Sequence, residues 1–247
     1  MYREYAPPPD LGSHVACTWT RSAARDESTL VIPDACADVI VVGEAAHVAG
    51  PADRPERVEL HAGIVIHGLR MRPGAARDLL HTDLGELRNE HIELASVTRA
   101  LVIDPRHPRA SLEQWARAQL VKARPDGAAV HAARLFLHDA SVDEAADALG
   151  FGARRLHRHV TAACGYGPKT LQRILRLQRA IRLAFTQSLA AVAATAGYAD
   201  QAHMTREFRA LTGLSPVAYL AEAEPGVGQW LSEIFKTPGA RRGTLAA

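Results

Sequence analysis

The second half of the chain contains two copies of one unit, and this internal duplication constrains the fold more than any other feature. Ala145-Ala146, Leu149 and Gly150 recur at an offset of 47 residues as Val192-Ala193, Ala196 and Gly197. A further set, Leu156, Arg158, Val160, Gly165 and Pro168, recurs at an offset of 48 as Met204, Arg206, Phe208, Gly213 and Pro216. The copies therefore differ by one residue just after a glycine, and both should fold in the same way.

Each copy is predicted to form a helix-turn-helix motif. It begins with a short helix of small apolar residues, passes through a glycine, and ends in a helix whose apolar positions alternate with Arg, His, Gln and Thr. Gly150 and Gly197 stand where the chain must turn, and glycine adopts the left-handed conformation at little cost. Ser141, followed by Glu144, is typical of a capping box. We expect the second helices at about 153–164 and 200–212.

A basic amphipathic helix is predicted between the copies, from Lys169 to Phe185. Roughly 17 helical residues span about 26 Å at 1.5 Å per residue. A rigid spacer of this length holds two helices close to one duplex turn apart, about 34 Å, so that both can enter successive major grooves. We expect Arg179 on this helix to support binding to specific and non-specific DNA alike.

Positive charge is concentrated in the same stretch. The formal net charge is only +2, because residues 1–124 hold 15 Lys and Arg against 17 Asp and Glu. Between residues 150 and 210, ten basic side chains accompany only Asp200 and Glu207. One basic amphipathic helix is more often a solvated surface, but two copies in register around a basic spacer favour a nucleic-acid surface, which needs local positive charge.

The candidate DNA-reading residues are the outward positions of the two second helices. Leu156 and Val160 should pack inward in the first copy, and Met204 and Phe208 in the second. The outward positions are Ala153, Arg154, His157 and Arg158 in the first copy, and Gln201, Ala202, Thr205 and Arg206 in the second, whereas His203 is ambiguous by spacing. Arg can bind guanine and Gln can pair with adenine in the major groove; each residue contacts either a base or a phosphate.

The second copy closely resembles the signature of the AraC-type transcription regulators, over the stretch GYADQAHMTREFRALTGLSPVAY that starts at Gly197. The stretch LGFGARRLHRHV, from Leu149, matches the less distinctive first half of the same domain, so that the resemblance covers about 100 residues. It implies base contacts from Arg154, His157 and Arg158 in one helix and from Gln201, Ala202, His203, Thr205 and Arg206 in the other.

Two departures from the family pattern affect the helix starts and the core. Family members usually have Ser where Gly152 and Ala199 stand, and Ser would cap the helices. We expect Asp200 to cap the second helix and the start of the first to be weaker. Met204 replaces the usual Phe, which a flexible side chain can do in an adaptable core.

The first half of the chain is predicted to be β-rich. Between Leu30 and Met71, short apolar segments at 29–32, 38–42 and 63–67 are separated by Pro, Gly and Asp clusters. A helix is expected from about Ser111 to before Pro125. The fold class is therefore α+β: a β-rich N-terminal domain, then an all-α domain of two helix-turn-helix motifs joined by a long helix. We expect domains at 1–124 and 125–224, and a tail at 225–247 that docks as a short helix.

Three distant cysteines, Cys17, Cys36 and Cys164, do not form a disulfide framework, which favours a reducing cytoplasm. Alternation places Cys36 and Asp38 on one face of a strand. Their segment resembles one in the sensor-like N-terminal domains of some of these regulators. Two interpretations stay open: a turn with a buried thiol, or a site for an effector or a redox signal. No cysteine or histidine spacing predicts a metal site, and no cofactor is expected.

The predicted function is sequence-specific transcription regulation without enzymatic activity. The resemblance implies that the partner is double-stranded promoter DNA, with RNA polymerase as a further partner if the protein is an activator. A small-molecule effector and a homodimer are compatible with the N-terminal domain, which senses an effector or mediates association. No run of about 20 apolar residues predicts a membrane span. The alternative is a DNA-alkyl-damage response protein with Cys36 as the reactive cysteine, although no repair motif surrounds it.

Overall fold

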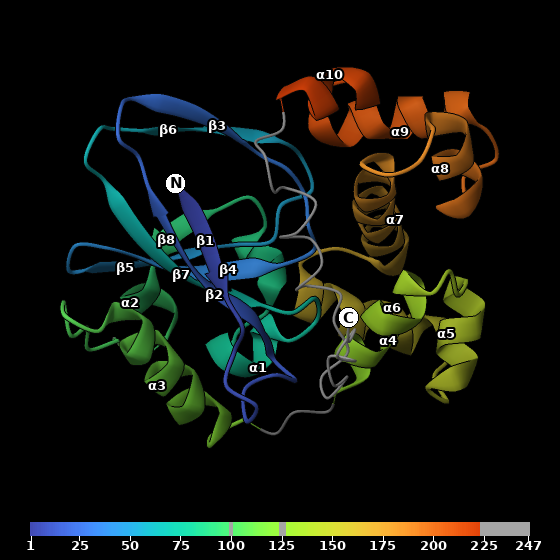
Figure 1. The fold of residues 1–247 in the computed structure, drawn as a ribbon. Coiled ribbons are helices and arrows are strands. Elements are labelled where there is room, and N and C mark those ends of the chain that lie inside the picture. The colour runs from blue at the N-terminus through green and yellow to red at the C-terminus, as the bar shows by residue number, and fades with distance from the viewer. Residues whose placement is uncertain (99–100, 124–126, 223–247) are drawn as a thin grey trace, which may run out of the picture.

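The computed structural model describes residues 1–98, 101–123 and 127–222. A β-rich part is followed by a helical part (Figure 1). The strands are β1 (Tyr2–Tyr5), β2 (Val15–Ser22), β3 (Glu27–Val31), β4 (Ala37–Val42), β5 (Ala45–Ala49), β6 (Glu56–Leu60), β7 (Val65–Met71) and β8 (His91–Glu93). The helices beside them are α1 (Ala76–Leu80), the 3-10 helix η1 (Leu84–Leu87), α2 (Leu94–Val97) and α3 (Pro108–Leu120). This arrangement confirms the predicted α+β class.

The main sheet has six antiparallel strands in the order β1-β2-β7-β4-β5-β8, and β3 pairs with β6 in a separate two-stranded sheet. Alternation along β7 separates two faces: Leu69 and Met71 are buried in a core that includes Leu79 of α1 and Leu112 of α3. Arg70 lies on the opposite face. The sheet therefore has an apolar face covered by α1 and α3, and a second face with polar groups.

Three of the strands correspond to the predicted apolar segments, namely β3, β4 and β7. Strands β1, β2, β5, β6 and β8 lie outside the predicted segments; in β1 and β2, Arg, Thr and Tyr interrupt the apolar alternation. The predicted helix near Ser111 is confirmed as α3, which begins with Pro108 at its first turn, a position where proline costs no hydrogen bond.

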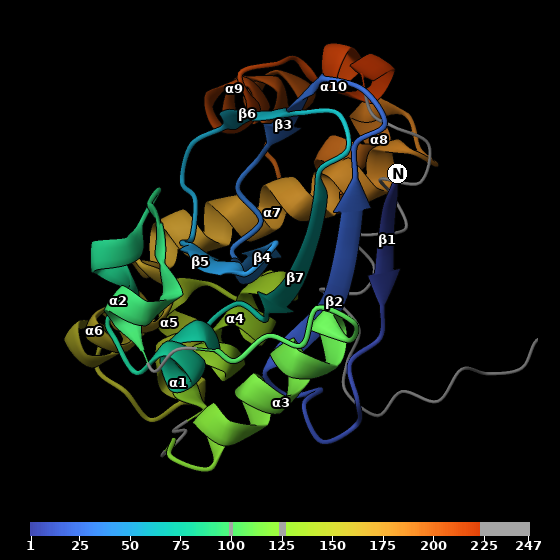
Figure 2. The same cartoon turned by 90° about the vertical axis from the view of Figure 1, so that its left-hand side faces the viewer.

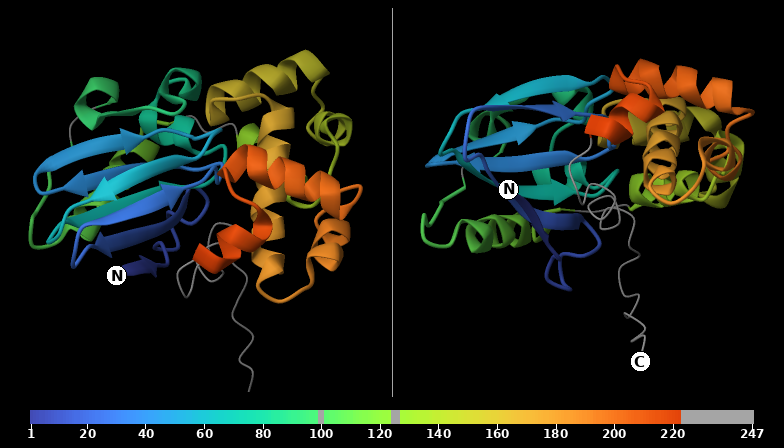
Figure 3. Two further views of the ribbon diagram at one scale, coloured as in Figure 1. Left: turned by 90° about the horizontal axis from the view of Figure 1, so that it is seen from above. Right: turned by 45° about the horizontal axis from the view of Figure 1, so that its top comes forward.

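The helical part consists of α4 (Ala128–Leu137), α5 (Val142–Ala148), α6 (Ala153–Cys164), α7 (Pro168–Ala184), α8 (Leu189–Thr195), α9 (Gln201–Thr212) and α10 (Pro216–Glu222). Helices α5 and α6 form the first predicted motif, α8 and α9 form the second, and α7 is the predicted spacer. The two views in Figure 3 show α7 passing from the first motif to the second.

The first motif packs tightly against the β-rich part. Ala35, which precedes β4, shares one apolar cluster with α4, α5, α6, α7 and α9. A Cβ on Gly165, the residue that ends α6, would lie 2.8 Å from the carbonyl oxygen of Leu84 and 2.8 Å from Pro51 Cγ. A Cβ on Gly74 would lie 2.6 Å from the backbone of Ala129 in α4. The backbones of the two parts therefore touch where only glycine fits.

The second motif meets the β-rich part through more open contacts. Figure 2 shows the β3–β6 pair beside α9 and α10. Pro55 Cγ would be 3.9 Å from a Cβ on Gly213, which is ordinary van der Waals contact. Arg57 pairs with Glu222 at 3.7 Å, and both side chains are exposed.

Two predictions fall partly or wholly outside the described residues: the domain boundary, which the sequence places at 124–127, and the tail at 225–247. The division into 1–124 and 125–224 stays a prediction. Among the described helices, none combines the length and apolar character that crossing a membrane requires.

Candidate nucleic-acid interface

The turns of both motifs have the conformation that their glycines predict. Gly150 has a φ of 63° and Gly197 a φ of 80°, both in the left-handed region. The capping box before α5 is confirmed, because Ser141 Oγ accepts the N–H of Glu144 and the Glu144 carboxylate accepts the N–H of Ser141.

Helices α6 and α9, the second helices of the two motifs (here called the recognition helices), start differently, as the sequence predicts. Asp200 caps α9, since its Oδ1 accepts the N–H of His203 at 2.6 Å. Gly152 precedes α6 with extended backbone but offers no side-chain hydrogen bond. One N–H of the first turn of α6 therefore lacks the partner that Asp200 supplies in α9.

The inward faces of both helices are buried as predicted. Leu156 and Val160 of α6 are fully buried, and Met204 and Phe208 of α9 are each 1% exposed. These four side chains fix which face of each helix is left for a ligand. The opposite faces contain the predicted DNA-reading residues.

In α6 the predicted residues Arg154, His157 and Arg158 are all exposed. The His157 ring lies against the turn before α7, where a Cβ on Gly167 would be 2.8 Å from its Nε2. The guanidinium of Arg155 stacks 4.0 Å from the ring centroid of Phe151, which orders the start of the helix.

In α9 the residues Gln201, Ala202 and Arg206 are exposed, whereas Thr205 and His203 are half-buried. The Thr205 hydroxyl donates to the carbonyl oxygen of Gln201 at 2.8 Å.

His203, which the spacing left ambiguous, faces the turn of its own motif. Its Nδ1 accepts the N–H of Ala199 at 3.4 Å, and its ring meets the Tyr198 ring edge-on at 5.5 Å. These contacts give His203 a structural role, and leave Gln201, Ala202 and Arg206 as the exposed predicted residues at the start of the helix.

Two basic residues of α7 are held in ion pairs with neighbouring helices and turns. The guanidinium of Arg179 donates to the Asp139 carboxylate and to the Leu137 carbonyl oxygen, and its side chain is only 13% exposed. Arg173 pairs with Glu207 of α9 at 2.8 Å. The expectation that Arg179 supports DNA binding stays a prediction, and the ion pair and burial argue against direct contact: amphipathic spacing does not distinguish an arginine that faces solvent from one that pairs with a neighbouring turn.

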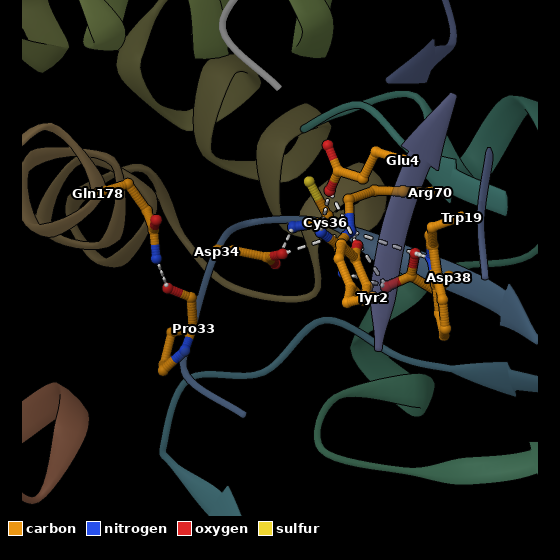
Figure 4. A network of polar contacts seen from close by, with 9 residues as sticks. All are labelled: Tyr2, Glu4, Trp19, Pro33, Asp34, Cys36, Asp38, Arg70 and Gln178. Atoms are coloured by element: carbon orange, nitrogen blue, oxygen red, sulfur yellow. Dashed lines mark hydrogen bonds and ion pairs between the residues drawn. The ribbon is translucent and has the colours of Figure 1, made fainter. Parts of the chain in front are cut away.

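A polar cluster lies on the second face of the main sheet (Figure 4). Asp38 accepts hydrogen bonds from Trp19 Nε1 at 3.0 Å and from Arg70 Nε at 3.2 Å. Arg70 also lies 3.6 Å from Asp34 and 3.7 Å from Glu4. Burial raises the pKa of the Asp34 and Glu4 carboxyls above their usual range. Asp38 is thus one member of an internal ion-pair network.

Cys36 lies at the edge of this network and is 4% exposed. Burial raises the pKa of its thiol well above the ordinary value, and Asp34 raises it further. A thiol held in its protonated form is a poor nucleophile. No group of three or more candidate metal ligands occurs among residues 1–98, 101–123 and 127–222.

The loop at residues 32–36, which precedes β4 and contains Asp34 and Cys36, connects the polar cluster to the spacer helix α7. Gln178, fully buried in α7, donates from Nε2 to the carbonyl oxygen of Pro33 (Figure 4). The segment that contains Asp34 and Cys36 therefore joins the main sheet to the helix between the two motifs. Two motifs with exposed, partly basic helices, held by one spacer helix against a β-rich part, define the class of two-motif DNA-binding proteins.

Comparison with known families agrees with this class. A family model described as a helix-turn-helix domain matches residues 145–222, and one described as a domain of unknown function (DUF6597) matches residues 3–93. Residues 145–222 therefore match a helix-turn-helix domain, which agrees with a DNA-binding role in transcription regulation. No curated protein matches the chain in sequence.

Solved structures of ToxT from Vibrio cholerae have a similar fold at low identity. An apo ToxT from strain SCE256 has a TM-score of 0.46 and 11% identity, covering 83% of this chain and 96% of its own. ToxT from strain O395 has a TM-score of 0.44 and 12% identity, covering 83% of this chain and 95% of its own.

Proposed function

We propose that α6 and α9 enter successive major grooves of promoter DNA and read its sequence. The observation that supports this most is the shared orientation of the two copies: each buries the same apolar positions and exposes Arg158 or its counterpart Arg206. Arg154, His157 and Arg158 read one groove segment, and Gln201, Ala202, Thr205 and Arg206 read the other, with His203 supporting the second turn.

We assign DNA binding to the helical part at 125–224, and signal sensing or association to residues 1–124. The shared core at Ala35 and the Gln178 hydrogen bond supply a direct physical connection for such a signal. A redox signal or alkyl transfer at Cys36 has little support, because the thiol is buried and its pKa is raised. We propose no enzymatic activity.

The test starts with selection of bound duplexes from a random pool by the full chain. Binding of a selected duplex and of random DNA is then measured at two salt concentrations. We expect preference for the selected duplex and a loss of affinity at higher salt, because counterions are released when cations meet phosphates. Equal affinity for selected and random DNA would refute the proposal.

Arg206→Ala probes base reading directly. Losing a bidentate guanine contact should weaken specific binding by about 5- to 150-fold and relax the preference at one base pair. Arg209→Ala is the matched control, because it removes the same charge from an exposed position further along α9. It should weaken binding to selected and random duplexes by the same factor. If both variants behave alike, Arg206 does not read a base.

A further inference from the structure

One carboxylate in the turn before the first motif touches the turn of the second motif, across α7. Asp139 lies in the turn between α4 and α5, has a φ of 68°, and accepts a hydrogen bond from the Arg179 guanidinium. Its two carboxylate oxygens would lie 3.0 and 3.2 Å from a Cβ on Gly197, the turn glycine of the second motif. Asp139 therefore fills the space beside the turn of the other copy, and Arg179 holds it there.

A second contact ties α7 to the recognition helix of the second motif. Arg173 Nε donates to Glu207 Oε1 at 2.8 Å, and the Glu207 side chain is only 15% exposed. One turn further along, the Arg176 guanidinium lies 5.4 Å from the ring centroid of Tyr198, in the turn before α9. Bonds to charged partners in partly buried places restrict rotation more than exposed pairs do.

One apolar cluster joins α7 to the second motif. The cluster contains Ala180 of α7 with Val192, Ala193, Ala196, Tyr198 and Met204. Phe208 and Leu211 of α9 also share a buried core cluster with Ile174 of α7. This packing holds α9 against α7, and the two ion-paired contacts add directional bonds that constrain the angle of α9 relative to α6.

Resting on the function proposed above, we propose that Asp139–Arg179 and Arg173–Glu207 are positioning pairs that fix the separation and angle of α6 and α9. They make the protein selective for the spacing between its two groove segments. Each added base pair moves a groove segment by about 3.4 Å along the duplex and about 34° around it. A rigid joint cannot follow such a displacement, whereas a loosened joint can.

The experiment uses the full chain and the operator selected above, together with versions of that operator that have one or two base pairs inserted between its two groove segments. Asp139→Asn removes the ion pair and keeps the shape of the side chain. Asp147→Asn is the matched control: it removes one negative charge from α5, the helix that follows Asp139, and among the described contacts no side-chain bond involves Asp147. Glu207→Gln tests the second pair independently. A thermal melt of each variant confirms folding.

Wild type and Asp147→Asn should lose on the order of tenfold in affinity for each inserted operator, because one helix loses its base contacts. Asp139→Asn and Glu207→Gln should lose clearly less, although they bind the original operator more weakly. The inference is overturned if the variants and wild type show the same ratio of affinities for the original and the inserted operators. It is also overturned if wild type binds the inserted operators as tightly as the original one. In both cases operator preference would persist, whereas failure of the proposed function abolishes that preference.

Discussion

Gly165 and Gly213 are equivalent residues of the two copies, and their different surroundings yield a quantitative prediction. Each ends its recognition helix in the left-handed conformation, with φ of 79° and 75°. A Cβ on Gly165 would meet the Leu84 carbonyl oxygen and Pro51 at 2.8 Å, whereas a Cβ on Gly213 would meet only Pro55 at 3.9 Å. Alanine at the two sites therefore separates the conformational cost from the cost of displacing the β-rich part.

The conformational cost is common to both variants and amounts to about 1–2 kcal/mol for a non-glycine residue in this region. Gly213→Ala should lose only this amount of unfolding free energy. Gly165→Ala should lose a further ~1–3 kcal/mol, because backbone and proline atoms must move away from the added methyl group. For a chain of this size each 1 kcal/mol lowers the Tm by about 2–4 °C.

Thermal unfolding followed by circular dichroism measures both variants against wild type, and denaturant titration checks that the slope with denaturant is unchanged. Gly165→Ala should melt below Gly213→Ala by at least a few degrees. Equal midpoints would refute the close approach of the first motif to the β-rich part. A larger loss for Gly213→Ala would place the tight contact at the second motif instead.

Two further predictions concern the helix caps and the cysteines. Asp200→Ala should lower the free energy of unfolding by about 1 kcal/mol, because it removes the acceptor for the His203 N–H. Gly152→Ser should raise the free energy of unfolding by roughly 0.5 kcal/mol, since the backbone is already extended and a Cβ there meets nothing within 4 Å. Thermal melts measure both variants, and a destabilised Gly152→Ser would contradict the expectation. All three thiols are buried, and burial raises the pKa of Cys164 to about 12. A thiol reagent at mildly alkaline pH should thus label the native protein far more slowly than the unfolded chain, and one rapidly labelled cysteine in the native protein would disprove this.

The helical part could be predicted from sequence because its determinants are local. The turn glycines, the Ser141 capping box and the inward apolar positions all act within one or two helical turns. The same reasoning could not find the partner of Arg179, because Asp139 lies 40 residues away. Strands β1 and β2 were missed for a related reason: Trp19 is stabilised in its strand by Asp38 and stacks on Tyr2, contacts that exist only after the sheet has formed.

The duplication is symmetric in sequence but asymmetric in its contacts, and this difference bears on how a signal would travel. The first copy shares a core with Ala35 and meets the β-rich part at Gly165, so it moves with that part. The second copy adds Phe208 and Leu211 to the same core, but a Cβ on its Gly213 would be in ordinary contact with Pro55, and the Arg57–Glu222 pair is exposed and contributes little energy. A change in the loop at Pro33 would therefore reach the second copy through this core as well as through Gln178 and the arginines of α7. On the functions proposed above, the helix that fixes the spacing of the two motifs is also the element through which a signal from the β-rich part would act.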